Sequence, residues 1–281
     1  MARSEAALAS PAREYVVRFD VHQRIQHILM FTSFIILAVT GFPQKYADLS
    51  ISQQFIGLLG GLETTQLIHH VAAWVMIFDG VYHVVYLAYS IVVRRQLRGL
   101  QMIPSLKDFL DLKDAILYFA GARKTRPRFG RFAYLEKFDY WAVFWGMFIM
   151  GGSGLVLMYP VIVSRLAGGP VVPMALAAHS DEAVLAVAWI FLVHLFYAHL
   201  APAVFPFNTS IFTGKVPIER YREEHPLELE AGAPIAVVQA ERVARQATDK
   251  TDVVPTVEDL YPGRRGRKPR VPGPGEGGGS V

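Results

Sequence analysis

Cysteine is missing from this sequence of 281 residues. Its absence excludes disulfides, iron–sulfur clusters, thiolate metal sites and covalently attached c-type haem within the chain. Any iron held here must therefore take histidine, methionine or oxygen ligands. A cleavable signal pattern is also missing, so we interpret the basic start and the apolar segment after it as an uncleaved anchor.

Charge is scarce over four long stretches. Residues 25–44, 140–164 and 183–214 carry no Asp, Glu, Lys or Arg, and residues 64–93 carry only Asp79. A helix needs about 20 mainly apolar residues to cross a membrane, and 52% of the chain is hydrophobic. We therefore predict an all-α integral membrane protein built as a four-helix bundle. Its spans are expected near 25–43, 66–93, 139–160 and 182–206.

Basic residues are divided unevenly among the loops. Four arginines precede the first stretch and 11 basic residues run from Arg94 to Lys137, whereas the other two loops hold only Lys45 and Arg165. Because Lys and Arg mark cytoplasmic loops, we expect both termini on the cytoplasmic side of a bacterial-type inner membrane. The pI near 9.2 then reflects topology, and no basic face that suits nucleic acid is visible.

The segments around these spans differ in composition. Residues 1–24 are expected to form a cytoplasmic arm, 25–206 the membrane domain and 207–230 a polar cytoplasmic extension. The remainder, 231–281, is rich in Pro, Gly and charge, so we expect a disordered tail.

Two local signals mark helix ends. Gly41 and Pro43 punctuate the exit of the first span. Ser105 is suited to cap a helix in the middle loop, where apolar residues recur at helical spacing. This pattern predicts an amphipathic helix on the inner membrane surface.

Histidines stand in or beside the charge-poor stretches, where an imidazole is costly unless it has a partner or a function. His69 and His83 are 14 residues apart, and His179 and His194 are 15 apart. At about 1.5 Å and 100° per residue, each pair spans about 21 Å and stays near one helix face. That layout can hold two metal cofactors with imidazole ligands, one toward each side of the membrane.

Depth sorts these histidines into two levels. The outer level holds His69, His179 and a spare, His70. The inner level holds His27, His83 and His194. Spacing alone leaves His27 and His83 as alternatives for the inner metal. His199 follows His194 by five residues, about 7 Å deeper and about 140° around an α-helix, so it is not expected to serve the same metal.

Four stretches together resemble one protein family. They are RFDVHQRIQHILMFTSFIILAVTGF (18–42), LIHHVAAWVMI (67–77), AYLEKFDYWAVFW (133–145) and AHSDEAVLAVAWIFLVHLFYAHLAP (178–202). In order and spacing they resemble the spans of the dihaem b-type cytochrome subunits of membrane formate dehydrogenases and nickel–iron hydrogenases. In that family a histidine in span one precedes a Ser/Thr-Gly pair, which His27 and Thr40-Gly41 match. The likeness covers about residues 15–230.

This resemblance implies two non-covalent b haems. The implied ligands are His69 and His179 for the outer haem, and His27 and His194 for the inner one. The chain departs from the family because its two ligands in span four lie one residue further apart, and because His83 and His199 are additional. These two histidines are candidates of second rank, and a third haem that involves His199 stays an alternative.

Polar residues near the inner level are candidates for a quinone or proton site, since quinone chemistry moves protons. They are Asp79, Tyr134, Glu136, Lys137, Asp139, Tyr140 and His199. The alternative is a purely structural role. Asp79 would then pair with a neighbour within the bundle, and the other residues would belong to the solvated end of span three.

The function implied is electron transfer between a partner oxidoreductase subunit and the quinone pool. A haem with two axial histidines has no open position, so we expect no complete active site in this chain. The expected partner is an iron–sulfur or catalytic subunit, or an outer multihaem cytochrome fed by quinol oxidation. The alternative is a haem-free membrane anchor, or a transporter whose histidines bind metal or protons.

Overall fold

The computed structural model describes residues 14–202, 204–232 and 235–239. The chain divides into one unit of 1–239 and a second of 240–281, and the second lies outside the described residues. What is described is mostly helical.

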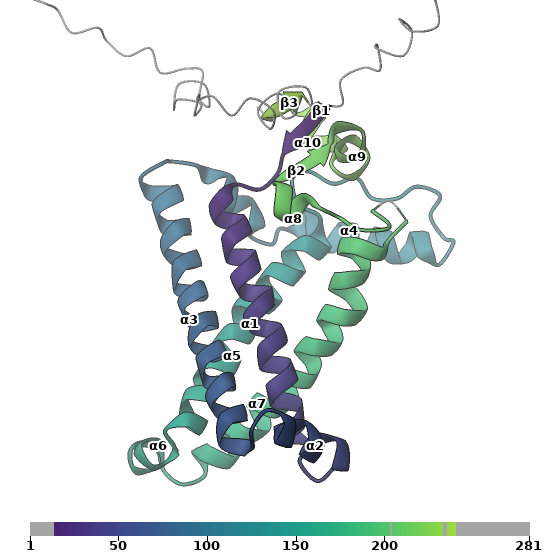
Figure 1. The fold of residues 1–281 in the computed structure, drawn as a ribbon. Helices are drawn as coiled ribbons and strands as arrows, with labels where there is room; N and C mark the ends of the chain where they lie inside the picture. The colour runs from purple at the N-terminus through teal and green to yellow at the C-terminus, as the bar shows by residue number, and fades with distance from the viewer. Residues whose placement is uncertain (1–13, 203, 233–234, 240–281) are drawn as a thin grey trace, which may run out of the picture. The chain divides into compact units, whose positions relative to one another are not determined.

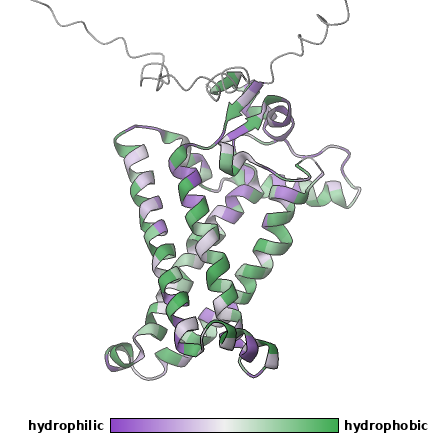
Figure 2. Ribbon diagram, viewed as in Figure 1, coloured by the Kyte–Doolittle hydropathy of each residue, from purple (hydrophilic) through white to green (hydrophobic). Residues whose placement is uncertain are grey.

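Four long helices dominate the fold (Figure 1). They are α1 (Val21–Lys45), α3 (Leu62–Val92), α5 (Tyr134–Met158) and a fourth helix over Val171–Leu200. The fourth begins as α7 (Val171–Trp189) and continues as two π-helical segments, η3 (Ile190–His194) and η4 (Phe196–Leu200). By length and composition each of the four can cross a membrane, and Figure 2 shows the apolar residues along them. The prediction of four helices of this kind is confirmed.

The bounds of all four helices differ from the prediction, by a few residues for α1, α3 and α5 and by more for the fourth. Helix α1 begins at Val21 and continues through Pro43 to Lys45, where a span of about 25–43 was expected. A proline so close to the end removes one hydrogen bond of the last turns, and the helix tolerates this loss. The fourth helix begins at Val171, well before the expected start at 182. The expected span was taken to begin where the charged residues before it end, but the helix itself continues through those charged residues.

Side-chain caps begin two of the helices. Asp20 accepts from the Gln23 backbone N–H at 2.9 Å, and the Gln23 side chain accepts from the Asp20 backbone N–H at 3.0 Å, which starts α1 with a capping box. At the start of α4 (Leu106–Phe119), the Ser105 backbone N–H and hydroxyl both donate to the Asp108 side chain, at 2.6 and 2.7 Å, so the predicted helix of the middle loop is confirmed. The connections also contain α2 (Ser50–Leu58), η2 (Leu97–Met102) and α6 (Pro160–Ala167).

The long helices pack mainly as two pairs, α1 with α3 and α5 with α7. The buried residues of α1 are Gln26, Ser33 and Thr40, seven residues apart. The buried residues of α3 are Thr65, Ala72, Asp79 and Ser90. We call the contact along these two rows the α1–α3 seam. Small and polar side chains let two helices approach closely inside a membrane, which explains why the seam holds the buried polar residues.

Polar contacts show which helix ends lie together. At the end of α1, Lys45 donates to Ser180 and pairs with Asp181, at 2.9 and 2.8 Å. Just before α1, Arg18 pairs with Glu136 in the first turn of α5 at 3.1 Å. The connections α2 and α6 therefore share one end of the bundle, and α4 and the strands share the other (Figure 1).

A small antiparallel sheet joins residues that are far apart in the sequence. Strand β1 (Glu14–Val17) lies between β2 (Lys215–Pro217) and β3 (Val237–Gln239). Its buried cluster is Val16, Val216, Ile218 and Tyr221. The fold is thus mostly helical and not all-α as predicted, because strands of three or four residues show no readable alternation.

The sheet also changes the expected segment boundaries. The arm of 1–24 contains β1 and the start of α1, and the tail expected from 231 contains β3. The extension of 207–230 folds into α8 (Ser210–Thr213), β2, α9 (Ile218–Glu224) and α10 (Pro226–Glu230). Residues 1–13 and 240–281, which hold the rest of the arm and most of the expected disordered tail, lie outside the described residues.

A buried ionic network fastens the sheet to the segment before α5. Arg18, only 6% exposed, donates to the Tyr221 hydroxyl at 3.3 Å and to Glu136 at 3.1 Å. Tyr221 in turn donates to Glu228, which also pairs with Arg131 at 3.1 Å. Burial works against the ionised form of Glu228, but the bond from Tyr221 and the charge of Arg131 outweigh it and lower the pKa of that carboxyl.

His225 lies beside this network and is also buried. Its Nδ1 donates to the backbone carbonyl of Gly130 at 2.7 Å. Burial, and then the positive charge of Arg18, lower the pKa of His225 below its ordinary value.

Candidate metal-cofactor site

The outer level contains a facing pair of histidines from different helices. The rings of His69 on α3 and His179 on α7 have centroids 6.3 Å apart and planes inclined by 66°. The two rings meet edge to face and are not stacked.

The inner level contains a second facing pair. The rings of His27 on α1 and His194 at the end of η3 also have centroids 6.3 Å apart, with planes inclined by 32°. Each pair takes one ring from the α1–α3 pair of helices and one from the α5–α7 pair. The structure thus brings together the two pairs that the family resemblance implied.

The ring separation tests whether a metal fits between the rings. Imidazole nitrogen binds a transition metal at about 2 Å, and the ring centre lies about 1 Å further, so two rings on one metal have centres about 6 Å apart. Both pairs match this separation. Two histidines alone leave most positions of a metal unfilled, whereas the four nitrogens of a porphyrin complete six-coordinate iron with two axial rings.

Hydroxyl groups set the tautomers of both outer rings. Thr40 donates to the Ile36 carbonyl at 2.7 Å, so its oxygen accepts from His69 Nδ1 at 2.9 Å. Ser153 donates to a backbone carbonyl of its own helix, and its oxygen accepts from His179 Nδ1 at 3.0 Å. The Met150 carbonyl, 3.2 Å from the same nitrogen, can only accept. Each Nδ1 therefore carries the proton, and each Nε2 keeps its lone pair for a metal.

A glycine lies beside each outer ring, where a larger residue would crowd it. A Cβ at Gly41 would lie 3.2 Å from Cε1 of His69, and a Cβ at Gly154 would lie 3.2 Å from Cε1 of His179. Each glycine directly follows the hydroxyl residue that holds the same ring. In each of the pairs Thr40-Gly41 in α1 and Ser153-Gly154 in α5, the hydroxyl residue thus binds an outer ring and the glycine leaves space for it. Only the first pair was recognised from the sequence, and the second was missed.

A carboxylate holds the inner ring of the fourth helix. Asp139 on α5 accepts from His194 Nδ1 at 3.1 Å and from Trp189 Nε1 at 2.7 Å. A carboxylate behind a metal-ligating histidine orients the ring and raises its basicity. Across the pair, Nδ1 of His27 is buried and has no hydrogen-bond partner among the described residues. The sequence placed Asp139 at the mouth of span three but did not connect it to His194.

Both ring nitrogens of His83 are already engaged. Nδ1 lies 3.0 Å from the Gln26 side-chain oxygen, and Nε2 lies 3.0 Å from the Tyr140 hydroxyl. A metal would have to displace one of these partners. Of the two alternatives for the inner level, His27 is therefore the one whose ring lies beside His194 and keeps a ring nitrogen without a partner among the described residues.

The π-helical segments change the position expected for His199. In a π-helix the hydrogen bonds join residues five apart, as between Ala201 N and the Phe196 carbonyl at 2.8 Å. His199 therefore follows His194 by about one wide turn, and the angle of about 140° calculated for an α-helix does not apply. Its ring stacks on Phe207 at 4.2 Å, and its Nδ1 accepts from Asn208 N–H at 3.3 Å. A neutral ring that accepts at Nδ1 offers a donor at Nε2 and not a metal lone pair.

The other candidates for a quinone or proton site do not form one cluster. Glu136 pairs with Arg18, and Lys137 pairs with Asp108 at 2.9 Å. Burial opposes the ionised form of Asp108, but the hydrogen bonds from Lys137 and Ser105 outweigh it and lower the pKa of this carboxyl. The ion pairs of Glu136 and Lys137 thus connect α5 to the segment before α1 and to α4.

The remaining candidates are divided among the helices. Tyr134 packs on Phe129 with ring centroids 5.9 Å apart. Tyr140 belongs to the group around His83, and Asp79 is buried in the α1–α3 seam.

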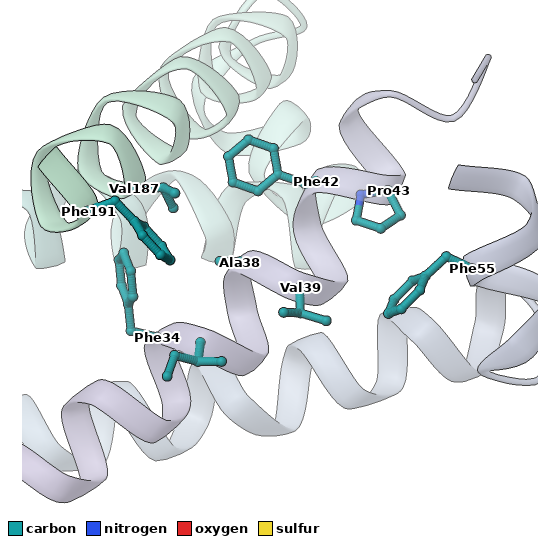
Figure 3. A pocket seen from close by; sticks show the side chains of 9 residues that line it. Phe34, Ala38, Val39, Phe42, Pro43, Phe55, Val187 and Phe191 are labelled. Atoms are coloured by element: carbon teal, nitrogen blue, oxygen red, sulfur yellow. The ribbon is translucent and has the colours of Figure 1, made fainter. Parts of the chain in front are cut away.

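An apolar groove of about 360 Å³ opens between α1, α2 and the fourth helix (Figure 3). Phe34, Phe42, Phe55 and Phe191 are among its walls. Along the fourth helix the groove lies between the two histidine levels, and along α1 it extends from Phe34 past the outer level to Pro43. Its lining holds no charged side chain, so it suits hydrocarbon and does not supply chemistry.

Within the described residues, no group of three or more His, Asp or Glu side chains is suited to a metal ion. The chemistry of the site therefore depends on the two facing pairs. No protein-family model matches this chain, and comparison with curated proteins finds no significant match.

Proposed function

We propose that this protein is a membrane b-type cytochrome that binds two non-covalent haems and exchanges electrons with the quinone pool. The observation that carries the proposal is the pair of facing histidine rings at each level, both with centroids 6.3 Å apart. His69 and His179 hold the outer haem, and His27 and His194 hold the inner one. Haem b supplies one-electron exchange between ferrous and ferric iron.

The residues around each pair have distinct tasks in this proposal. Thr40 and Ser153 fix the tautomers of the outer ligands, and Asp139 orients His194. The group of His83, Gln26 and Tyr140 lies beside the inner pair, since Gln26 precedes His27. This group is the proposed contact for a quinone head group, and the side chain of His199 is a second donor.

A partner oxidoreductase subunit, or a multihaem cytochrome, completes the electron path in this proposal. The cytoplasmic side is assigned to the end that holds the sheet and α4, because most basic residues outside the tail lie there.

Haem analysis of the purified protein tests this function. The protein in detergent should give reduced b-type absorption bands and two haems per chain in a pyridine haemochrome assay, all extractable with acidic acetone. His179→Ala should lose one haem and His194→Ala the other. His27→Ala should lose the inner haem, whereas the matched variant His83→Ala should retain both.

Two results would reject the proposal or its ligand assignment. Wild-type protein without haem would favour the haem-free anchor or transporter. Loss of the inner haem in His83→Ala, with retention in His27→Ala, would exchange the inner ligand.

A further inference from the structure

The α1–α3 seam contains a buried acid that the haem ligation does not use. Asp79 is 4% exposed, and its Oδ1 has no hydrogen-bond partner among the described residues. It is also the only charged residue between Glu63 and Arg94. A carboxyl kept inside a membrane helix in this state costs stability, so it points to a functional role.

A complementary donor is unpartnered in the same seam. Gln26 is buried, and its Nε2 has no partner among the described residues. Its other amide atom, Oε1, accepts from His83 Nδ1, and His83 Nε2 then accepts from the Tyr140 hydroxyl. Asp79 lies one helical turn from His83. A water that binds both the Gln26 amide and the Asp79 carboxyl would satisfy the two unpartnered atoms.

Polar groups continue from this point to the surface. His22 is exposed, and its Nδ1 lies 2.6 Å from the Tyr82 hydroxyl. The His22 ring also stacks on Tyr86 at 5.2 Å, and Tyr86 donates to Asp20, the exposed cap of α1. Residues 79, 82, 83 and 86 follow one stripe of α3, and 22 and 26 lie one turn apart on α1, so neighbouring groups on each helix are about one turn apart. A path along them would take bound waters between these groups.

We propose that the α1–α3 seam is a proton path between the aqueous surface at Asp20 and His22 and the buried carboxyl of Asp79. Gln26, His83 and Tyr140 are its middle section. This inference rests on the proposed quinone chemistry, because that reaction requires protons to move.

Oxidation of one quinol to quinone breaks two O–H bonds and releases two protons, and its two electrons would pass to the two proposed haems. The Asp79 carboxylate accepts one proton at a time and becomes a neutral acid. The proton returns to the surface by way of His83, which takes a proton at Nε2 and releases one from Nδ1 to a bound water, while the Gln26 amide orients this ring and does not itself carry a proton. Quinone reduction uses the same groups in the opposite direction.

Stopped-flow reduction of the haems tests this path. The protein in liposomes is mixed with decylubiquinol or with menadiol, and in parallel with dithionite, which needs no proton path. Asp79→Asn should slow reduction by quinol at least tenfold and leave dithionite reduction and haem content unchanged. Asp79→Glu should restore much of the rate. The matched control is Thr65→Val, another buried polar residue of the seam without an ionisable group.

The surface end supplies a second test, which does not depend on a change in the buried seam. His22→Gln should slow reduction by quinol severalfold and enlarge its solvent deuterium isotope effect. Wild-type rates with quinol in both Asp79→Asn and His22→Gln would overturn the path while leaving the proposed function intact. Loss of haem in Asp79→Asn together with a wild-type quinol rate in His22→Gln would assign the seam a structural role. A wild-type protein that binds haem but is reduced by neither quinol would overturn the quinone chemistry and this path together.

Discussion

Asp139 is expected to set the reduction potential of the proposed inner haem. Its carboxylate accepts from His194 Nδ1 at 3.1 Å, whereas the outer ligands are held by the neutral hydroxyls of Thr40 and Ser153. A negative charge behind an axial ligand stabilises ferric iron. Asp139→Asn removes that charge and retains an oxygen that can accept the same hydrogen bond. The variant should therefore raise the inner potential and leave the outer one in place.

The size of this shift follows from Coulomb's law. One hydrogen bond, the width of an imidazole ring and one coordination bond separate the carboxylate from the metal, about 7 Å in all. At an effective dielectric constant of about 20, a unit charge at this distance contributes about 2 kcal/mol. For a one-electron couple this corresponds to about 100 mV, because 59 mV is a tenfold change.

A potentiometric titration of the haem bands gives the measurement. Wild-type protein should show two midpoints, and Asp139→Asn should move one of them upward by about 100 mV. Ser153→Ala is the matched comparison, since it removes a neutral partner of the outer level and should shift the other midpoint much less. If both haems are retained in Asp139→Asn and neither midpoint moves, the carboxylate does not act on the inner metal and the reasoning is wrong.

Three further outcomes are expected. Gly41→Val should displace the His69 ring and lower the content of the outer haem, while Gly57→Val, where a Cβ meets nothing within 4 Å, should not. Because the folded pKa of His225 is lowered, the unfolded chain binds more protons below about pH 6.5, so the sheet should become less stable as the pH falls. Hydrogen exchange of β1 at several pH values should show this trend, and His225→Gln should flatten it. Alkaline phosphatase fused to the C-terminus should be inactive in intact cells, and strong activity would reverse the proposed orientation.

The four helices and their histidine pairs were accessible from the sequence for a physical reason. Charge is excluded from a membrane interior, so charge-free stretches reveal the spans without a tertiary contact. The regular rise of a helix then converts sequence spacing into depth, which grouped His69 with His179 and His194 with His27 or His83. The structure contains the two histidine pairs, and the haems between them stay a prediction.

The supporting residues were not accessible in the same way. Asp139 reaches His194 only because α5 and the fourth helix adopt one particular rotation and register, which hydropathy does not specify. The sheet pairs Tyr15 with Pro217, and no local pattern links segments so distant. No residue composition distinguishes the π-helical turns around His194 from an α-helix. The position of His199 was therefore calculated with the angle of an α-helix, which does not apply.

The division into two helix pairs has a consequence for assembly. α1 and α3 follow one another in the chain, as do α5 and α7, so each pair is a hairpin that can form as soon as it enters the membrane. Each proposed cofactor takes one ligand from each hairpin. The two proposed haems would therefore hold together two hairpins that otherwise make few contacts with one another. Two separately expressed polypeptides, divided in the segment between α4 and α5, should therefore recover a spectroscopically normal cytochrome only in cells that make haem.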